Sequence, residues 1–274
     1  TDGSNRFKSR AGTRSGSTLT MGTEENVDTG VFTPIQILAD PVQANRVLCL
    51  GNQTNQYLTV RSGLYANGLV TWSTPRVVAS KINIEAVMAF DSATTSTSKF
   101  AISYRYRDYL PNNWAAAVTA GYMALTNTAP VPTIGTSVLF VPSVTGYYVT
   151  SISMGFKPNV AGNFVVMYSK SQNPVGLYSS AGQIAAGTGT TITFGTAYRV
   201  NTVTSTGTAI GFDPNDTSGK FILVYRKAIG PGAGLFTKVG TLSGTSASFG
   251  SEQILIEPPY DKNASITTEG INFQ

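Results

Sequence analysis

One short motif occurs five times along the chain, and this repeat constrains the fold more than any other feature. Each copy centres on a large apolar residue flanked by Thr or Ser, followed by Gly or Ser and a second Thr or Ser. The five copies are Leu19–Thr23, Val70–Thr74, Pro132–Thr136, Ile192–Thr196 and Ala247–Ser251. Their central residues recur every ~50–60 residues, a period typical of propeller blades rather than of helical solenoids.

Within each unit, short apolar and β-branched runs indicate four antiparallel strands, which we call a, b, c and d, with the motif in strand d. Strand a is predicted at Val47–Gly51, Val87–Asp91, Ile152–Phe156 and Ala209–Asp213, and strand b at Gln56–Arg61, Lys99–Arg105, Asn163–Ser169 and Lys220–Arg226. Strand c is clearest at Gly234–Leu242. Turn-forming residues such as those of Phe212–Gly219 join strands a and b, as expected for hairpins.

The two ends of the chain predict how the array closes. Phe7–Thr13 aligns with Leu235–Thr241, so the N-terminus supplies strands c and d without a preceding a and b. Ala264–Thr268 falls where a strand a is due, with a short strand b at Ile271–Gln274. We therefore predict an all-β, five-bladed propeller of four-stranded antiparallel blades, closed by a blade shared between the termini. The single domain, 1–274, is predicted to divide into full blades at 35–80, 83–143, 144–201 and 202–257, with 1–27 and 258–274 forming the shared blade.

The composition supports this assignment and argues against most catalytic and metal chemistry. Charged residues are only 12% of the chain, and Gly, Ser, Thr and Asn take their place, as in proteins built of strands and turns. The chain has no histidine, which removes the commonest general base and zinc ligand. Its single cysteine, Cys49, lies in an apolar run that indicates a buried structural thiol. We predict no metal and no cofactor.

The acidic residues give little support to hydrolysis. Asp91 and Asp213 occupy matching turns after strand a, and the same place is assigned to Lys157 in the third unit and Asn52 in the first. A position that accepts such different residues indicates a structural turn. No spacing along the chain brings together the two carboxylates that a glycoside hydrolase needs. We predict a protein that is not an enzyme.

Charge and hydropathy limit the partners. The net charge is +5, but four basic residues lie between Arg6 and Arg14 and the remainder is nearly balanced, so we expect no nucleic-acid partner. No apolar run reaches the ~18 residues of a membrane span, so we expect no membrane insertion.

The unit containing Phe212–Asn215, Lys220–Arg226 and Val239–Ser251 resembles the propeller-type repeats of bacteriophage virion and tail-fibre proteins. The resemblance extends over nearly the whole chain. It implies a viral surface or appendage protein, located in the virion, that meets a bacterial envelope. Its implied partners are other virion proteins, a bacterial surface glycan, or further copies of the chain in a homo-oligomer.

The loops between strands b and c differ most between units, as expected of a recognition surface on a rigid scaffold. The richest is Tyr104–Trp114, and the candidate binding residues in it are Arg105, Arg107, Asp108, Tyr109 and Trp114. Tyr65 and Tyr178 are weaker candidates on matching loops. Aromatic faces stack on sugar rings while Arg and Asp bond hydroxyls, but the same residue types suit a protein interface or packing between blades.

We therefore predict a virion structural or adhesion module. The first alternative is a five-bladed carbohydrate-binding lectin, which should show near-identical pockets in every blade. The second alternative is a glycoside hydrolase domain.

Overall fold

The computed structural model describes residues 6–27, 30–53, 57–80, 82–107, 113–126, 128–145, 148–171, 174–227 and 233–256. These residues form 22 β-strands, and the described part of the chain contains no helix. Accordingly, no helix there is long and apolar enough to cross a membrane. The all-β prediction is confirmed.

Four five-stranded antiparallel sheets share one strand order. In each, four strands pair in chain order, and a fifth pairs back onto the third. Blade 1 contains β3 (Phe32–Ala39), β4 (Arg46–Gln53), β5 (Leu58–Ala66), β6 (Leu69–Trp72) and β7 (Arg76–Ala79). Blade 2 contains β8 (Ile82–Phe90), β9 (Ser98–Arg107), β10 (Asn113–Met123), β11 (Thr133–Ile134) and β12 (Val138–Thr145). Blade 3 contains β13 (Val149–Phe156), β14 (Asn163–Lys170), β15 (Gly176–Ile184), β16 (Ile192–Phe194) and β17 (Tyr198–Arg199). Blade 4 contains β18 (Ser205–Phe212), β19 (Lys220–Lys227), β20 (Gly234–Ser243), β21 (Ser246–Phe249) and β22 (Gln253–Ile256).

The fifth sheet is a hairpin of β1 (Lys8–Ser15) and β2 (Thr18–Asn26). It packs on blade 1 through a cluster in which Phe7 and Trp72 surround Val27, Phe32 and Cys49. Cys49 is fully buried, which confirms the prediction for this residue, and its burial raises the pKa of the thiol to about 12. The predicted strands at 264–268 and 271–274 lie outside the described residues.

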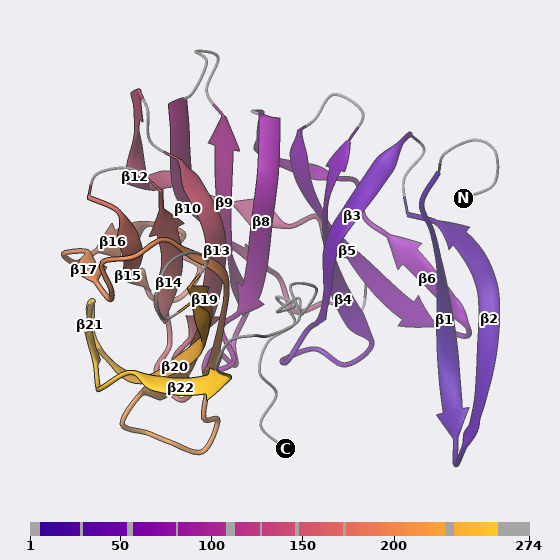
Figure 1. The fold of residues 1–274 in the computed structure, drawn as a ribbon. Helices are drawn as coiled ribbons and strands as arrows, with labels where there is room; N and C mark the ends of the chain where they lie inside the picture. Colours follow the sequence, from indigo (N-terminus) through magenta and orange to yellow (C-terminus); the bar gives the residue numbers. More distant parts are fainter. Residues whose placement is uncertain are drawn as a thin grey trace.

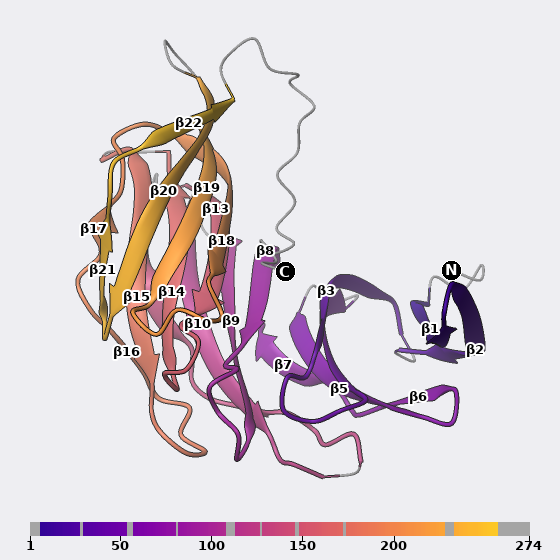
Figure 2. The same cartoon turned by 90° about the horizontal axis from the view of Figure 1, so that it is seen from below.

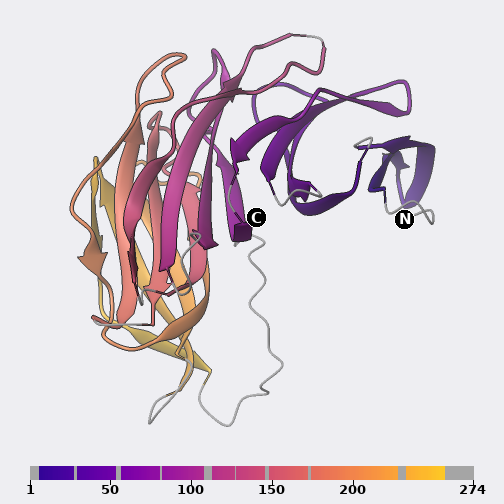
Figure 3. The same cartoon turned by 90° about the horizontal axis from the view of Figure 1, so that it is seen from above.

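The five sheets follow one another in chain order, as Figure 1 shows from the hairpin to blade 4. Figures 2 and 3 show them arranged as an arc, with their first strands on its inner side. Consecutive first strands are neighbours, β3 with β8, β8 with β13 and β13 with β18. This is the radial arrangement of propeller blades, in which the apolar faces of each sheet are covered by the sheets beside it.

The strand assignment of the first unit is wrong, because predicted strands a and b are each shifted by one strand in the order of the sheet. Val47–Gly51, predicted as strand a, lies in the second strand, β4, and the first strand is β3. A strand in the middle of a sheet is buried on both faces and reads as a continuous apolar run, whereas the edge strand facing the axis is partly exposed. The apolar run was therefore assigned to the wrong strand. The turn residue of blade 1 equivalent to Asp91 is consequently Asp40, not Asn52. Both aspartates donate their backbone N–H to a carbonyl at the start of strand b, that of Arg46 for Asp40 and that of Lys99 for Asp91.

Strand pairing explains why the motif repeats. In all five sheets the central motif residue lies directly opposite a glycine of strand c: Met21 opposite Gly12, Trp72 opposite Gly63, Ile134 opposite Gly121, Phe194 opposite Gly182 and Phe249 opposite Gly240. In blades 2 to 4 a phenylalanine of strand b lies across that glycine, where a Cβ atom would come within 2.2–2.5 Å of the ring. In blade 1 strand b has the smaller Val47 there, and the Trp72 ring covers Gly63 instead. The glycine is therefore needed for space rather than for an unusual backbone angle.

Basic side chains also fasten each blade to the next. The Arg46 guanidinium of blade 1 donates to the Ala124 carbonyl of blade 2, and Lys99 of blade 2 donates to the Ala185 carbonyl of blade 3. Lys157 of blade 3 donates to the Leu242 carbonyl of blade 4 at 3.4 Å. Each acceptor lies where strand c ends, so the contact recurs with the blade.

Candidate functional site

The richest group of predicted binding residues lies at one end of the blades, where strand b leads into strand c; we call this the b–c end. Two of these residues, Arg105 on β9 and Trp114 on β10, come together there, with the Arg105 guanidinium carbon 5.4 Å from the centre of the Trp114 ring. Tyr148, just before blade 3, places its ring centre 6.0 Å from that of Trp114. Arg107 pairs with Trp114 across the two strands and is exposed. Asp108 and Tyr109 lie outside the described residues.

The charges of this cluster also join blades 2 and 3. Arg105 forms an ion pair with Glu85 of β8 at 2.9 Å and donates to the Val149 carbonyl of β13. The Glu85 carboxylate accepts the backbone N–H of Ile152 at 3.2 Å. Burial raises the pKa of Glu85, although the nearby Arg105 acts in the opposite direction. Arg105 is thus occupied within the fold, which leaves Arg107 as the exposed cation of the cluster.

Trp114 contributes an aromatic surface and a polar atom to the same place. The residue is half-buried, and its indole nitrogen is buried with no hydrogen-bond partner among the described residues. The site is therefore a half-buried Trp–Tyr pair edged by an exposed guanidinium, on strands whose backbones are fixed by pairing on both sides. Such a surface can stack on a flat apolar face and bond to hydroxyl or carboxylate oxygens.

Arg105, Arg107 and Trp114 were predicted in a loop and lie in strands, and the two weaker candidates also lie in strands. Tyr178 is buried in β15, where its ring stacks on Tyr168 at 5.6 Å and its hydroxyl donates to the Pro174 carbonyl. Blade 4 repeats this arrangement with the stacked pair Tyr225 and Phe236, so Tyr178 has a packing role.

Tyr65 lies on β5, near the turn into β6, which is the opposite end of the blade from the b–c end. Its predicted placement on a loop between strands b and c is wrong. The turn after β5 joins strands c and d, because predicted strands a and b of the first unit are shifted by one strand. Tyr65 is half-buried there.

Sequence reasoning missed Glu85 and Tyr148 as members of this cluster. Glu85 could have been found from hairpin register, since strands β8 and β9 place it directly opposite Arg105. Tyr148 has no such signal, because it reaches Trp114 from the next blade.

The acidic residues weighed for hydrolysis hold turns. Asp91 is fully buried, and its carboxylate accepts hydrogen bonds from Ala93, Thr94 and Gly162. Asp213 is exposed and accepts the backbone N–H of Asn215 at 2.9 Å. The structure thus places these two carboxylates in separate turns.

A hollow lies on the inner side of the blades. It has a volume of about 320 Å³ and is bordered by the first strands of blades 1 to 4, with Leu38, Met88, Met154 and Ile210 among its lining residues. None of the residues lining this hollow is charged. Over the described ranges, no group of three or more Cys, Asp or Glu side chains is arranged to hold a metal ion.

Known proteins resemble the chain only distantly. No protein-family model and no curated protein sequence matches it. An exo-β-1,3-galactanase from Phanerochaete chrysosporium, solved with galactose, matches 84% of this chain and 51% of its own, at 10% identity and a TM-score of 0.41. A putative 6-phosphogluconolactonase from Bacteroides fragilis matches 93% of this chain and 83% of its own, at 9% identity and a TM-score of 0.37. The chain spans about half the length of the galactanase, and likenesses this weak transfer no activity to it.

Proposed function

We propose that the chain is a non-enzymatic structural or adhesion module of a bacteriophage virion, such as a tail-fibre or surface protein. In this proposal it contacts a host surface glycan or another virion protein through the b–c end of its blades. The observation that supports it is the Trp114–Tyr148 pair beside the exposed Arg107, with Trp114 and Arg107 opposite each other on paired strands. Aromatic and arginine side chains are the residue types that supply most binding energy at interfaces.

Divergence between blades favours one contact face over a lectin with one pocket per blade. In blade 2 the b–c end carries Trp114 and Arg105, whereas blades 3 and 4 place Tyr178 and Phe236 within stacked, buried pairs. A single interface needs only one such cluster. A multivalent sugar binder would need it repeated.

The first experiment is binding of the labelled chain to a panel of bacterial cells and their extracted surface glycans. We expect selective binding that weakens about fivefold or more in Arg107→Ala, since truncating a central contact costs over ~1 kcal/mol. The matched control is Arg76→Ala, because Arg76 is an exposed arginine on the outer strand β7 of another blade. Equal binding by Arg107→Ala and the parent would contradict the assigned face.

Incubation of the chain with the same glycans distinguishes adhesion from hydrolysis. We expect no release of reducing sugar on prolonged incubation. Measurable release would contradict the non-enzymatic assignment. Absence of binding to every cell type would restrict the proposal to a structural role within the virion.

A further inference from the structure

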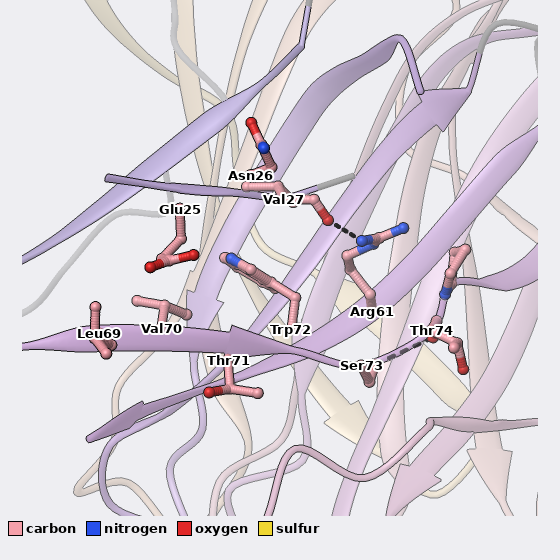
Figure 4. A pocket seen from close by; sticks show the side chains of 11 residues that line it. Glu25, Asn26, Val27, Arg61, Leu69, Val70, Thr71, Trp72, Ser73 and Thr74 are labelled. Atoms are coloured by element: carbon pink, nitrogen blue, oxygen red, sulfur yellow. Dashed lines mark hydrogen bonds between the residues drawn. The ribbon is translucent and has the colours of Figure 1, made fainter. Parts of the chain in front are cut away.

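A groove of about 460 Å³ separates the N-terminal hairpin from blade 1. One side is formed by Glu25, Asn26 and Val27, and the other by Arg61 and the segment 69–75. Figure 4 shows the indole of Trp72 directed from β6 toward the segment that carries Glu25 and Val27. None of the predicted binding residues lines this groove.

The repeat explains why the groove exists. In later blades the residue equivalent to Trp72 is covered by the fifth strand of the preceding blade. Phe140 of β12 contacts Phe194 with ring centres 5.9 Å apart, and Tyr198 of β17 stacks on Phe249 at 5.6 Å. In the hairpin that precedes blade 1, the end of β2 takes the place of a fifth strand, because Glu24–Asn26 pair with β1 beyond the motif. This segment brings Glu25 and Val27, rather than an aromatic ring, beside Trp72. The place filled by a ring in the later blades is here an open groove.

Trp72 is held in a fixed orientation beside this space. Its indole N–H donates to the Ser9 hydroxyl at 3.0 Å, and its ring lies against Gly63, where a Cβ atom would come within 2.8 Å. The residue remains half-buried. A rigid indole bordering a hollow loses little conformational entropy when a ligand stacks on it.

The polar groups of the groove distinguish the class of ligand. Glu25 is half-buried and has no ion-pair partner among the described residues, whereas its neighbour Glu24 pairs with Lys8 and Arg10. The Arg61 guanidinium is engaged with the Val27 carbonyl and lies 5.8 Å from the Phe32 ring centre. The groove therefore offers a carboxylate acceptor but no exposed cation from Arg61, which disfavours acidic ligands.

We propose that this groove binds one hexose unit of a neutral glycan. The apolar face of the sugar ring stacks on Trp72, and its hydroxyls bond to the Glu25 carboxylate, which points toward the same space (Figure 4). The groove volume falls in the range of small-molecule sites, ~300–1,000 Å³. This site is separate from the face around Arg107 and stands whether or not that face binds cells.

The chain has two tryptophans, so Trp114→Phe leaves Trp72 as the single tryptophan whose emission is followed. The full-length variant is titrated with methyl glucoside, methyl galactoside and N-acetylglucosamine, with sodium glucuronate as the charged comparison. We expect a saturable change in Trp72 emission with at least one neutral sugar and a weaker response to glucuronate. No saturable change with any neutral sugar, in protein that melts cooperatively, would overturn the proposal.

Two adjacent carboxylates supply the matched variants. Glu25→Ala should weaken sugar binding about tenfold or more, because it removes a charge-assisted hydrogen bond, and Glu24→Ala should leave it unchanged. Equal weakening by both variants would overturn the assignment of Glu25. Arg107→Ala should leave the Trp72 response intact, which keeps failure of this site distinct from failure of the proposed adhesion face.

Discussion

At the scale of single residues, the most constrained group is the buried ion pair of Arg46 and Asp40. Both side chains are fully buried, and Arg46 Nε donates to Asp40 Oδ2 at 2.6 Å. The rest of the guanidinium is satisfied by Ser98 and by the Ala124 carbonyl of blade 2. Ser98 in turn donates to Asp40 Oδ1 at 2.8 Å, so both charges are compensated within the fold.

Removing one charge should therefore be far worse than removing both. We expect Arg46→Met to lower the free energy of unfolding by about 3–5 kcal/mol, because Asp40 is left buried without its partner. The double variant Asp40→Asn with Arg46→Met should recover part of that loss. Urea denaturation of the parent and both variants measures the difference, and a double variant no more stable than Arg46→Met would contradict the argument.

At the scale of the strand, the glycines opposite the motif residues set how closely the strands of a blade can pack. Gly182 lies opposite Phe194 on one side and Phe164 on the other, and an added Cβ would come within 2.5 Å of the Phe164 ring. The two rings meet edge to face at 5.6 Å over this position.

Gly182→Ala should consequently overpack the blade and lower stability by about 1–3 kcal/mol. Gly250→Ala is the control, because its added Cβ meets only the Val239 carbonyl, at 3.6 Å. Thermal unfolding should show a lower Tm for Gly182→Ala and a nearly unchanged one for Gly250→Ala. Equal melting of the two variants would show that the ring shifts at little cost.

At the scale of the whole molecule, the array of described sheets begins with the N-terminal hairpin and ends with blade 4. The hairpin β1–β2 is fixed to blade 1 by Val27, Phe7 and Trp72, and blade 4 exposes Val239 and Ile254. A blade shared between the termini would place residues 258–274 beside that hairpin, which stays a prediction.

Deleting residues 1–27 should lower the Tm of the domain by more than about 5 °C. The deletion should cost a few kcal/mol of stability, and each kcal/mol lowers the Tm of a domain of this size by about 2–4 °C. Deleting 258–274 should lower it similarly if both ends build one blade. Deleting only residues 1–5 is the control. An unchanged transition after the C-terminal deletion would contradict closure by a shared blade.

The sequence by itself determined the features that repeat along the chain. The motif spacing predicted five sheets, and hairpin patterns correctly placed strand b of blades 2 to 4, on β9, β14 and β19. The sequence also predicted that Arg105 and Trp114 lie close together, because two strands joined by one loop are neighbours. The sequence did not predict the fifth strands, and the shortest of them, β17 with two residues, is too brief to have a detectable period.

Only the tertiary structure decided what happens between blades. The contact of Tyr148 with Trp114, the basic links such as Arg46 to Ala124, and the open groove over Trp72 all join segments from different sheets. Pairing within a sheet follows a register that residue spacing encodes, whereas packing between sheets depends on how side-chain shapes fill the space between two faces. The same motif residue is therefore covered in blades 3 and 4 and left beside a groove in blade 1, according to whether the preceding sheet supplies an aromatic ring over it.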